Sequence, residues 1–272
     1  MNEIEMTSTI DSYHLEISYD GTEYFGWQIQ PDQLTVQKVL QDTLKKLYAG
    51  QNVKVQGSSR TDSGVHALGL AVSFTAPCRP NISMKKLEVA LNCLLPQTIR
   101  IRSIRAVDSE FNARFASTGK AYTYVINTGQ QVPFSNRYCW HHRNCQNIDE
   151  MEKAAAFLIG KHDFSSFTVL RSQIDSAVRT IYDIQLQKIG QYLCITFKGD
   201  GFLYKMIRCL TGALVAVGCN RITAADLQLL LLAKDRDKGE ITAPPQGLFL
   251  MKVFYGDDKW QDFDLNQLPF SY

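Results

Sequence analysis

The chain has 272 residues, of which 45% are hydrophobic and 21% charged, and its formal net charge is +2 at pH 7. This composition is typical of a folded globular protein and excludes the disordered and fibrous classes. No apolar run approaches the ~20 residues that a membrane-spanning helix needs. The first residues are polar and acidic, unlike a secretory or transit peptide. We therefore expect a cytoplasmic protein with no membrane partner.

The seven cysteines follow no spacing framework, and an odd number in partly apolar surroundings indicates reduced thiols. The small net charge does not by itself indicate a nucleic-acid partner, although basic residues cluster locally. A solvated surface explains these charges equally well. The two clusters are Arg100, Arg102, Arg105 and Arg114, and a possible groove of Arg60, Arg79, Lys205 and Arg208.

Hydrophobic periodicity predicts two successive runs of strands and helices. The first run has strands over 13–19, 53–55, 70–74 and 99–106, with helices over 35–49, which begins at the N-cap Thr35, and 84–95, which is capped by Ser83. The second run has strands over 121–127, 181–187, 192–198 and 247–254, with helices over 150–159, 202–217 and 223–233. For the helix at 150–159, Asp149 and Glu152 have the spacing of a capping box.

The order β-α-β-β-α-β in each run is that of the ferredoxin-like or RRM-like unit. We predict an α+β fold in which two tandem units, over 1–110 and 111–272, share one broad, mainly antiparallel mixed sheet. The helices would cover one face, the other face would be free to bind, and a central cleft would separate the halves. This fold supports many functions and names none.

The segment Gly57-Ser58-Ser59-Arg60-Thr61-Asp62-Ser63-Gly64-Val65-His66 places one carboxylate among small residues in a turn between two strands. Small residues allow a ligand to approach closely, and the neighbouring Arg60 favours an ionised Asp62. An ordinary Asx turn explains the same residues, and from chemistry alone we would favour it.

Asp-Ser-Gly is also the triplet of aspartic proteases, which need two carboxylates that share a proton. A second such triplet does not occur, since Asp175-Ser176 is followed by Ala177. The α+β pattern also does not fit that all-β architecture, so we set the protease interpretation aside.

The segment resembles the catalytic motif of the TruA-type tRNA pseudouridine synthases, usually written Gly-Arg-Thr-Asp-Ala-Gly-Val-His. Ser59 and Ser63 replace the family's usual Gly and Ala. The resemblance extends over about residues 13–255 through further motifs in the same order: residues 19–28, 35–37, 111–115, 120–124, 162–167, 202–208 and 243–248.

This resemblance implies an enzyme that isomerises uridine to pseudouridine on the 3′ side of the tRNA anticodon stem-loop, at positions 38–40. It implies Asp62 as the catalytic nucleophile or base and Tyr122 as the residue that stacks on the target base. It also implies a homodimer that holds tRNA, with no DNA partner. No metal or redox cofactor is needed, because the product is an isomer.

The resemblance further implies that Arg208 pairs with Asp62 and that Arg60 and Arg114 contact the RNA. An independent argument supports the first pair: a cation within an apolar helix face is costly unless an anion partners it. For Tyr122, a core aromatic is the alternative interpretation, and Tyr124 fits that alternative better. We expect His66 to shape the loop rather than to catalyse.

The segment Cys139-Trp140-His141-His142-Arg143-Asn144-Cys145 lacks the spacing of a zinc site, so we expect a structural loop there. Two alternative functions stay open from sequence. One is a tRNA-binding protein or RNA chaperone whose catalysis is secondary. The other is a pseudouridine synthase that acts at other RNA positions.

Overall fold

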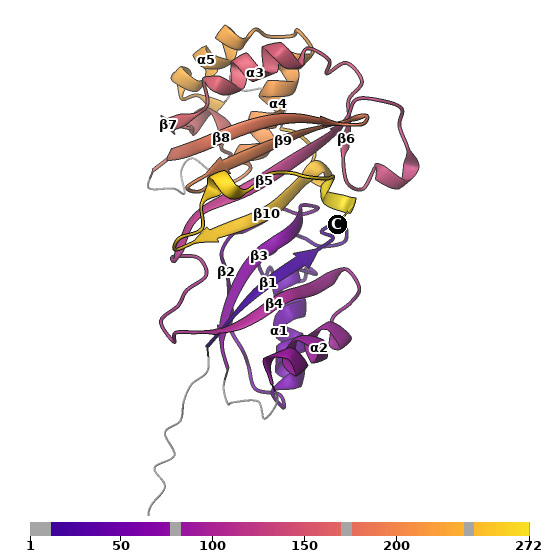
Figure 1. Cartoon of the computed structure of the whole chain (residues 1–272), viewed down its shortest axis with the longest axis vertical. Coiled ribbons are helices and arrows are strands. Elements are labelled where there is room, and N and C mark those ends of the chain that lie inside the picture. The colour runs from indigo at the N-terminus through magenta and orange to yellow at the C-terminus, as the bar shows by residue number, and fades with distance from the viewer. Residues whose placement is uncertain (1–11, 77–82, 170–175, 237–241, 272) are drawn as a thin grey trace, which may run out of the picture.

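The computed structural model describes residues 12–76, 83–169, 176–236 and 242–271. One ten-stranded sheet runs through this part of the chain from end to end, in the order β4-β1-β3-β10-β5-β9-β8-β7, with β2 paired to β3 and β6 paired to β5 (Figure 1). Five α-helices accompany the sheet in the described residues. The expected α+β class with a broad mixed sheet is confirmed.

The N-terminal half forms the part of the sheet at the bottom of Figure 1. The N-cap side chains of Thr35 and Ser83 accept hydrogen bonds from backbone N–H groups three residues on, as the sequence predicted. The elements in order are β1 (Ser12–Tyr19), α1 (Val36–Leu47), β2 (Val55–Gly57), β3 (His66–Thr75), α2 (Met84–Leu94) and β4 (Ile99–Val107).

The C-terminal half forms the upper part of the sheet in Figure 1, with its helices above it. Its hairpin turns at Gly190, whose φ of +58° suits glycine. The elements in order are β5 (Ser117–Asn127), β6 (Trp140–His141), α3 (Ile148–Ala156), β7 (Gly160–Asp163), β8 (Val178–Ile189), β9 (Tyr192–Gly199), α4 (Met206–Gly218), α5 (Ala224–Ala233) and β10 (Leu248–Tyr255).

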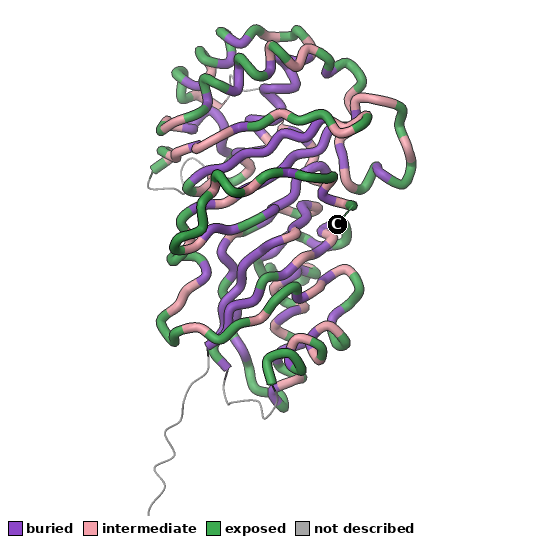
Figure 2. Tube along the Cα trace, in the orientation of Figure 1, coloured by how far each residue is buried: buried purple, intermediate pink, exposed green. Residues whose placement is uncertain are grey.

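The last strand joins the two halves. β10 lies parallel to β3, with Phe249 opposite His66 and Leu250 opposite Ala67, and antiparallel to β5 on its other side. Because these central strands carry side chains against both faces, they are the most buried part of the sheet (Figure 2). The tandem ferredoxin-like arrangement and the boundary between 110 and 111 stay predictions.

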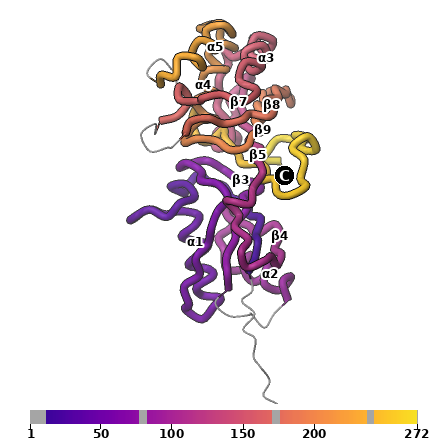
Figure 3. Tube along the Cα trace, turned by 90° about the vertical axis from the view of Figure 1, so that its left-hand side faces the viewer, coloured from indigo at the N-terminus to yellow at the C-terminus, as the bar shows by residue number. Residues whose placement is uncertain are grey.

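The two faces of the sheet are covered differently. All five helices contribute to one hydrophobic cluster on the first face. On the second face, residues from the C-terminal segment after β10, among them Phe263, Leu265 and Phe270, pack on the strands. Figure 3 shows this segment on the side of the sheet away from α1 and α4. The prediction that the second face is free is therefore wrong for the strands that this segment covers.

Two local expectations were also wrong. Asn147, not Asp149, caps α3, and its side chain accepts from the N–H of Glu150. The helix predicted over 202–217 begins only at Met206, because Lys205 adopts a left-handed conformation with φ +58°. The short strands β6 and β7 were not predicted. Among the described residues, no helix has the length and apolarity to cross a membrane.

Candidate active site

The loop between β2 and β3 holds Asp62 against a second loop that follows β1. Gly26 has φ +80°, and a Cβ there would lie 2.3 Å from the carbonyl oxygen of Thr61. The N–H of Trp27 donates to that same oxygen (3.2 Å), and the N–H of Gly64 donates to the carbonyl of Tyr24 (3.2 Å). Only glycine allows this close approach, so the two loops are held together by backbone contacts.

The side chain of Tyr19, on β1, also holds the Asp62 loop in place. The hydroxyls of Tyr19 and Thr61 are hydrogen-bonded (2.8 Å) in buried surroundings. Within the loop, the N–H of Val65 donates to the carbonyl of Asp62 (3.1 Å). The carboxylate therefore projects from a rigid backbone rather than from a free turn.

Arg208 of α4 reaches Asp62 from the other half of the chain. Its Nη1 donates to Oδ2 of Asp62 at 2.7 Å, and its Nε donates to the carbonyl of Ala243 at 2.8 Å. The two charged side chains are only 12% and 15% exposed, so water screens the pair weakly. The neighbours of Arg208 along α4 are buried, which is why this cation needs an anionic partner.

Tyr122 of β5 lines the same cavity as Asp62 and Arg208. Its hydroxyl is hydrogen-bonded to Oγ of Ser59 (2.7 Å), and the ring of Phe202 meets its ring edge-on with centroids 5.5 Å apart. Burial raises the pKa of Tyr122 to about 12, and the nearby Asp62 charge acts in the same direction. The phenol is therefore protonated at neutral pH.

These side chains surround a narrow cavity of about 50 Å³. Three cations, Arg60, Lys205 and Arg208, face the single carboxylate of Asp62, and Tyr122 closes one wall. Ligand pockets usually enclose ~300 Å³ or more, so a nucleobase enters only if side chains at the rim move. The exposed Arg60 is the most easily displaced, since it has no hydrogen bond or ion pair within the described residues.

Other predicted residues lie outside this cavity. Tyr124 is fully buried and its hydroxyl donates to the carbonyl of Pro244 (2.7 Å), which is the core position we expected. Arg114 does not line the cavity, and its guanidinium lies over the ring of the exposed Phe115 (5.5 Å). Arg79 lies outside the described residues.

His66 is the first residue of β3, directly after the Asp62 loop, and its side chain does not line the cavity. Its Nδ1 accepts from the N–H of Gly21 (3.0 Å), its Nε2 is 3.0 Å from the carbonyl of Arg137, and its ring stacks on Phe249. A proton on Nε2 satisfies both contacts. Its surroundings agree with the expected structural role.

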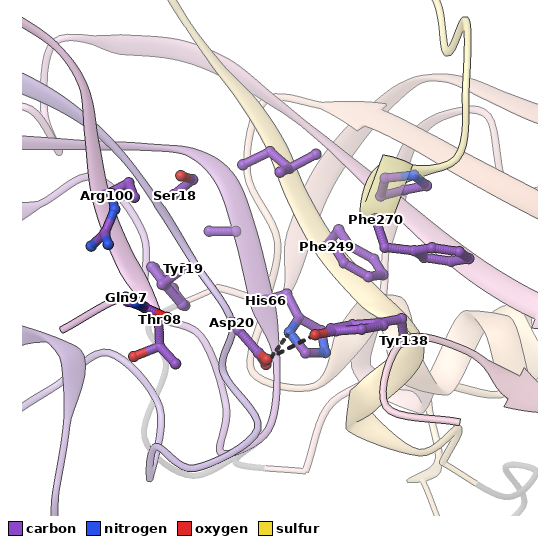
Figure 4. Close-up of a pocket in the computed structure, with 13 residues that line it drawn as sticks. Ser18, Tyr19, Asp20, His66, Gln97, Thr98, Arg100, Tyr138, Phe249 and Phe270 are labelled. Carbon is purple, nitrogen blue, oxygen red and sulfur yellow. Dashed lines mark hydrogen bonds and ion pairs between the residues drawn. The ribbon is translucent and has the colours of Figure 1, made fainter. Parts of the chain in front are cut away.

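A second cavity of about 240 Å³ opens beside His66 (Figure 4). The hydroxyl of Tyr138 donates to Oδ2 of Asp20 (3.0 Å), and Oδ1 of Asp20 accepts from the N–H of Thr22 (3.0 Å). Burial alone would raise the pKa of Asp20, but the hydrogen bonds that its Oδ1 accepts from the N–H and the hydroxyl of Thr22 hold this pKa below its usual range. Because these polar groups are hydrogen-bonded to one another, they stabilise the end of the Asp62 loop at His66.

The Cys139–Cys145 segment is occupied by other contacts. The thiol of Cys139 donates to the carbonyl of Ser135 (3.1 Å), and Nε2 of His141 is 3.0 Å from the carbonyl of Gly129. The Cys145 thiol lies 3.5 Å from the sulfur of Met151. The loop is thus tied to its own surroundings.

Sequence reasoning missed one contributor to the site: Ser59 appeared only as a departure from a motif, yet it bonds the hydroxyl of Tyr122. Lys205 was expected in a possible groove with Arg60 and Arg208, and all three line the cavity. Nothing in the sequence, however, signals the left-handed backbone of Lys205 at the start of α4. The glycines at 21 and 26 were a usable signal, because both stand where the backbone of the Asp62 loop passes at contact distance.

Comparison with known proteins finds matches that cover most of the chain. Residues 17–116 and 154–256 match the family model described as tRNA pseudouridine synthase. The tRNA pseudouridine synthase A of Thermoanaerobacter sp. (strain X514) is 43% identical over 240 residues, which cover 88% of this chain and 97% of the relative. The tRNA pseudouridine synthase A of Brevibacillus brevis is 41% identical, with the same coverage.

One solved structure with a distant likeness belongs to the archaeal box H/ACA sRNP Nop10-Cbf5 complex. It is 13% identical, with a TM-score of 0.35, and the match covers 79% of this chain and 45% of that chain. The chain therefore spans less than half of the length of that protein.

Proposed function

The chain belongs to the tRNA pseudouridine synthase family, and from that premise we propose that Asp62 is the nucleophile with which it isomerises uridine at positions 38–40 of the anticodon stem-loop. The observation that carries the proposal is the contact between Asp62 and Arg208, which joins the two halves at the cavity that Tyr122 lines. A carboxylate held in place by a guanidinium suits attack on a carbon centre, as in retaining glycosidases.

The reaction exchanges one bond for another without loss of atoms. The bond from C1′ to N1 of the base breaks, the base turns, and a bond from C1′ to C5 forms. The proton on C5 leaves and a proton is gained at N1. Asp62 would take part in breaking and remaking these bonds, while Arg208 holds its carboxylate in place.

Tyr122 would lie against the target base once the base enters the cavity. Because its pKa is raised to about 12, the phenol cannot act as a free phenolate at neutral pH. It can pass on a proton only if its own proton moves to a partner, and the Ser59 hydroxyl at 2.7 Å is the partner present. We include this relay for the C5 proton in the proposal.

The remaining residues would bind the RNA. Arg60 stands at the exposed rim, where it can contact the backbone or fill the space that a flipped nucleotide leaves. Arg114 presents a cation on an exposed aromatic ring, a combination suited to RNA. The proposal includes a homodimer that holds one tRNA, which sedimentation of the protein with and without tRNA would test.

The experiment that tests the substrate is to map pseudouridine in tRNA treated with the protein. Transcripts with uridine only at 38, 39 or 40, and transcripts with uridine elsewhere in the stem-loop, are compared. Conversion at 38–40 alone supports the proposal. Conversion elsewhere contradicts the position, and binding without conversion favours an RNA chaperone.

A further inference from the structure

Three cations lie close enough to affect one another at the N-terminal ends of β5 and β8, beside the cavity that contains Asp62. Lys120 is on β5, two residues before Tyr122, and Arg114 lies just before that strand. Arg179 is on β8. We propose that Lys120, flanked by Arg114 and Arg179, binds a backbone phosphate of the RNA next to the nucleotide held at Asp62. This inference rests on the proposed function and adds a substrate contact to it.

The alternation of the strand places Lys120 on the correct face. Successive residues of a strand point to opposite faces, so Lys120 and Tyr122 share one face, about 7 Å apart along β5. Tyr122 and Tyr124 belong to the cluster on the helix side, whereas Ala121 belongs to the cluster under the C-terminal segment. Lys120 therefore lies on the same face as Tyr122, two residues nearer the start of β5.

Arg179 reaches the same place from β8. In the register of the sheet, β9 lies between the two strands, with Gly199 opposite both Lys120 and Ile181. A Cβ at Gly201 would meet only Arg179 within 4 Å, so the space beside Arg179 is open there. At Gly199 the ring of Phe202 and the carbonyl of Thr180 occupy the corresponding space, so the open area lies on the Arg179 side of the cluster.

Within the described residues no ion pair neutralises these three cations, although Asp200 partly offsets their charge. Among the described residues, no carboxylate oxygen lies within 4 Å of a side-chain nitrogen of Arg114, Lys120 or Arg179. Asp200 acts on Lys120 from farther away, and its Oδ1 accepts from the N–H of Thr180. Burial lowers the pKa of Lys120, and Arg114 and Arg179 lower it further, so an anion placed here would relieve their repulsion.

Donors remain available for that anion. Nη1 of Arg179 donates to the carbonyls of Ser176 and Val178, which fixes the guanidinium and leaves its other nitrogens without a hydrogen bond in the described part of the chain. Arg114 is held over the ring of Phe115, which is 79% exposed. A phosphate has three or more acceptor positions for such converging donors.

The test measures binding of the full-length protein to anticodon stem-loop RNAs in which one phosphate of the 3′ side at a time carries a neutral methylphosphonate linkage. Wild type is compared with Lys120→Met and with Lys188→Met, a control that removes an exposed lysine far along β8. We expect one linkage to weaken wild-type binding about tenfold or more. The same linkage should have little further effect on Lys120→Met, and Lys188→Met should behave as wild type.

If every linkage weakens Lys120→Met as much as wild type, Lys120 does not hold a phosphate and the inference is wrong. If Lys120→Met fails to fold, Lys120→Arg and Arg179→Gln replace it: the first should keep the linkage effect, and the second should lower the salt dependence of binding by about one phosphate contact. An unchanged salt dependence in Arg179→Gln would also contradict the inference.

Because these readouts are affinities, they separate the two proposals. Coupling between Lys120 and one linkage without conversion of uridine would support the phosphate site and contradict the proposed function. Conversion without coupling would do the reverse.

Discussion

Arg208 on α4 and Asp62 in the β2–β3 loop are 146 residues apart in the sequence, and their side chains meet at 2.7 Å. Each half of the chain supplies one charge, so the carboxylate is held in its orientation only when the halves are joined. The parallel contact of β10 with β3 fixes that junction next to the loop. The pair therefore links the assembly of the sheet to the geometry of the site.

Replacing Arg208 with leucine should leave Asp62 without its partner in a poorly screened place. We expect a loss of about 2–3 kcal/mol in the free energy of unfolding, below the 3–5 kcal/mol of a fully buried pair because both groups keep some exposure. Activity should fall at least a hundredfold. Arg208→Lys should recover part of both, since it keeps the charge but loses the bond to Ala243.

Urea unfolding and initial rates measure these effects, and a double-mutant cycle with Asp62→Asn isolates the pair. The coupling between the two sites should be about 1 kcal/mol or more. Additive effects would show that the ion pair does not contribute.

Tyr122→Phe removes the hydroxyl but keeps the ring against Phe202. It should cost about 1 kcal/mol of stability for the lost Ser59 hydrogen bond. In wild type the folded pKa of about 12 lies above the ordinary value of 10.0, so the unfolded chain ionises first as pH rises. Stability from this group is complete below pH 10 and is lost towards pH 12, by about 1.4 kcal/mol at pH 11.

Guanidinium unfolding at pH 9 and pH 11 checks this sign. The wild type should lose more stability between these pH values than Tyr122→Phe does, although other buried tyrosines add to the loss in both. Equal losses would mean that the phenol ionises in the folded protein near its ordinary pKa.

His14→Phe tests a titration far from the site. Burial and the neighbouring Arg105 lower the pKa of His14 to about 4, so the unfolded chain binds the proton first as pH falls below 6.5. The contribution of His14 to stability is complete above that pH and is lost towards pH 4, by about 2 kcal/mol at pH 5. Phenylalanine keeps the edge contacts with Phe111 and Tyr255.

Unfolding of the wild type and His14→Phe at pH 7 and pH 5 separates this effect from that of other histidines. The variant should lose about 2 kcal/mol less than the wild type over this interval. Parallel losses would contradict the assignment.

The regular elements could be predicted from sequence because local signals specify them. Thr35 and Ser83 mark helix starts by their own side chains, and Gly190 marks a turn by its backbone freedom. The start of α4 could not be predicted, because the apolar pattern continues through Phe202 and Leu203 while Lys205 turns the backbone. The covering of the second sheet face was missed because residues after Tyr255 show no periodicity, although Trp260 stacks on Tyr182.

The site could be predicted in part. The costly position of Arg208 in an apolar helix demanded an anion, and the structure supplies Asp62. Choosing Tyr122 over Tyr124 needed a family resemblance, since the two residues are two positions apart on one strand and therefore lie on the same face. The role of Ser59 depends on a contact between a loop and β5, 63 residues on in the sequence, which no local pattern reveals. The role that we propose for Lys120 depends on the pairing of β5, β9 and β8, which is equally hidden from local patterns.

The central claim is that Asp62 carries out the isomerisation, and release of label from C5 of uridine tests it most directly. tRNA labelled with tritium at C5 is incubated with wild type and with Asp62→Asn, and the folding of both proteins is checked by thermal unfolding. We expect the wild type to release the label and Asp62→Asn to be slower by at least a thousandfold while it still binds tRNA. Equal release from the two proteins would contradict the account.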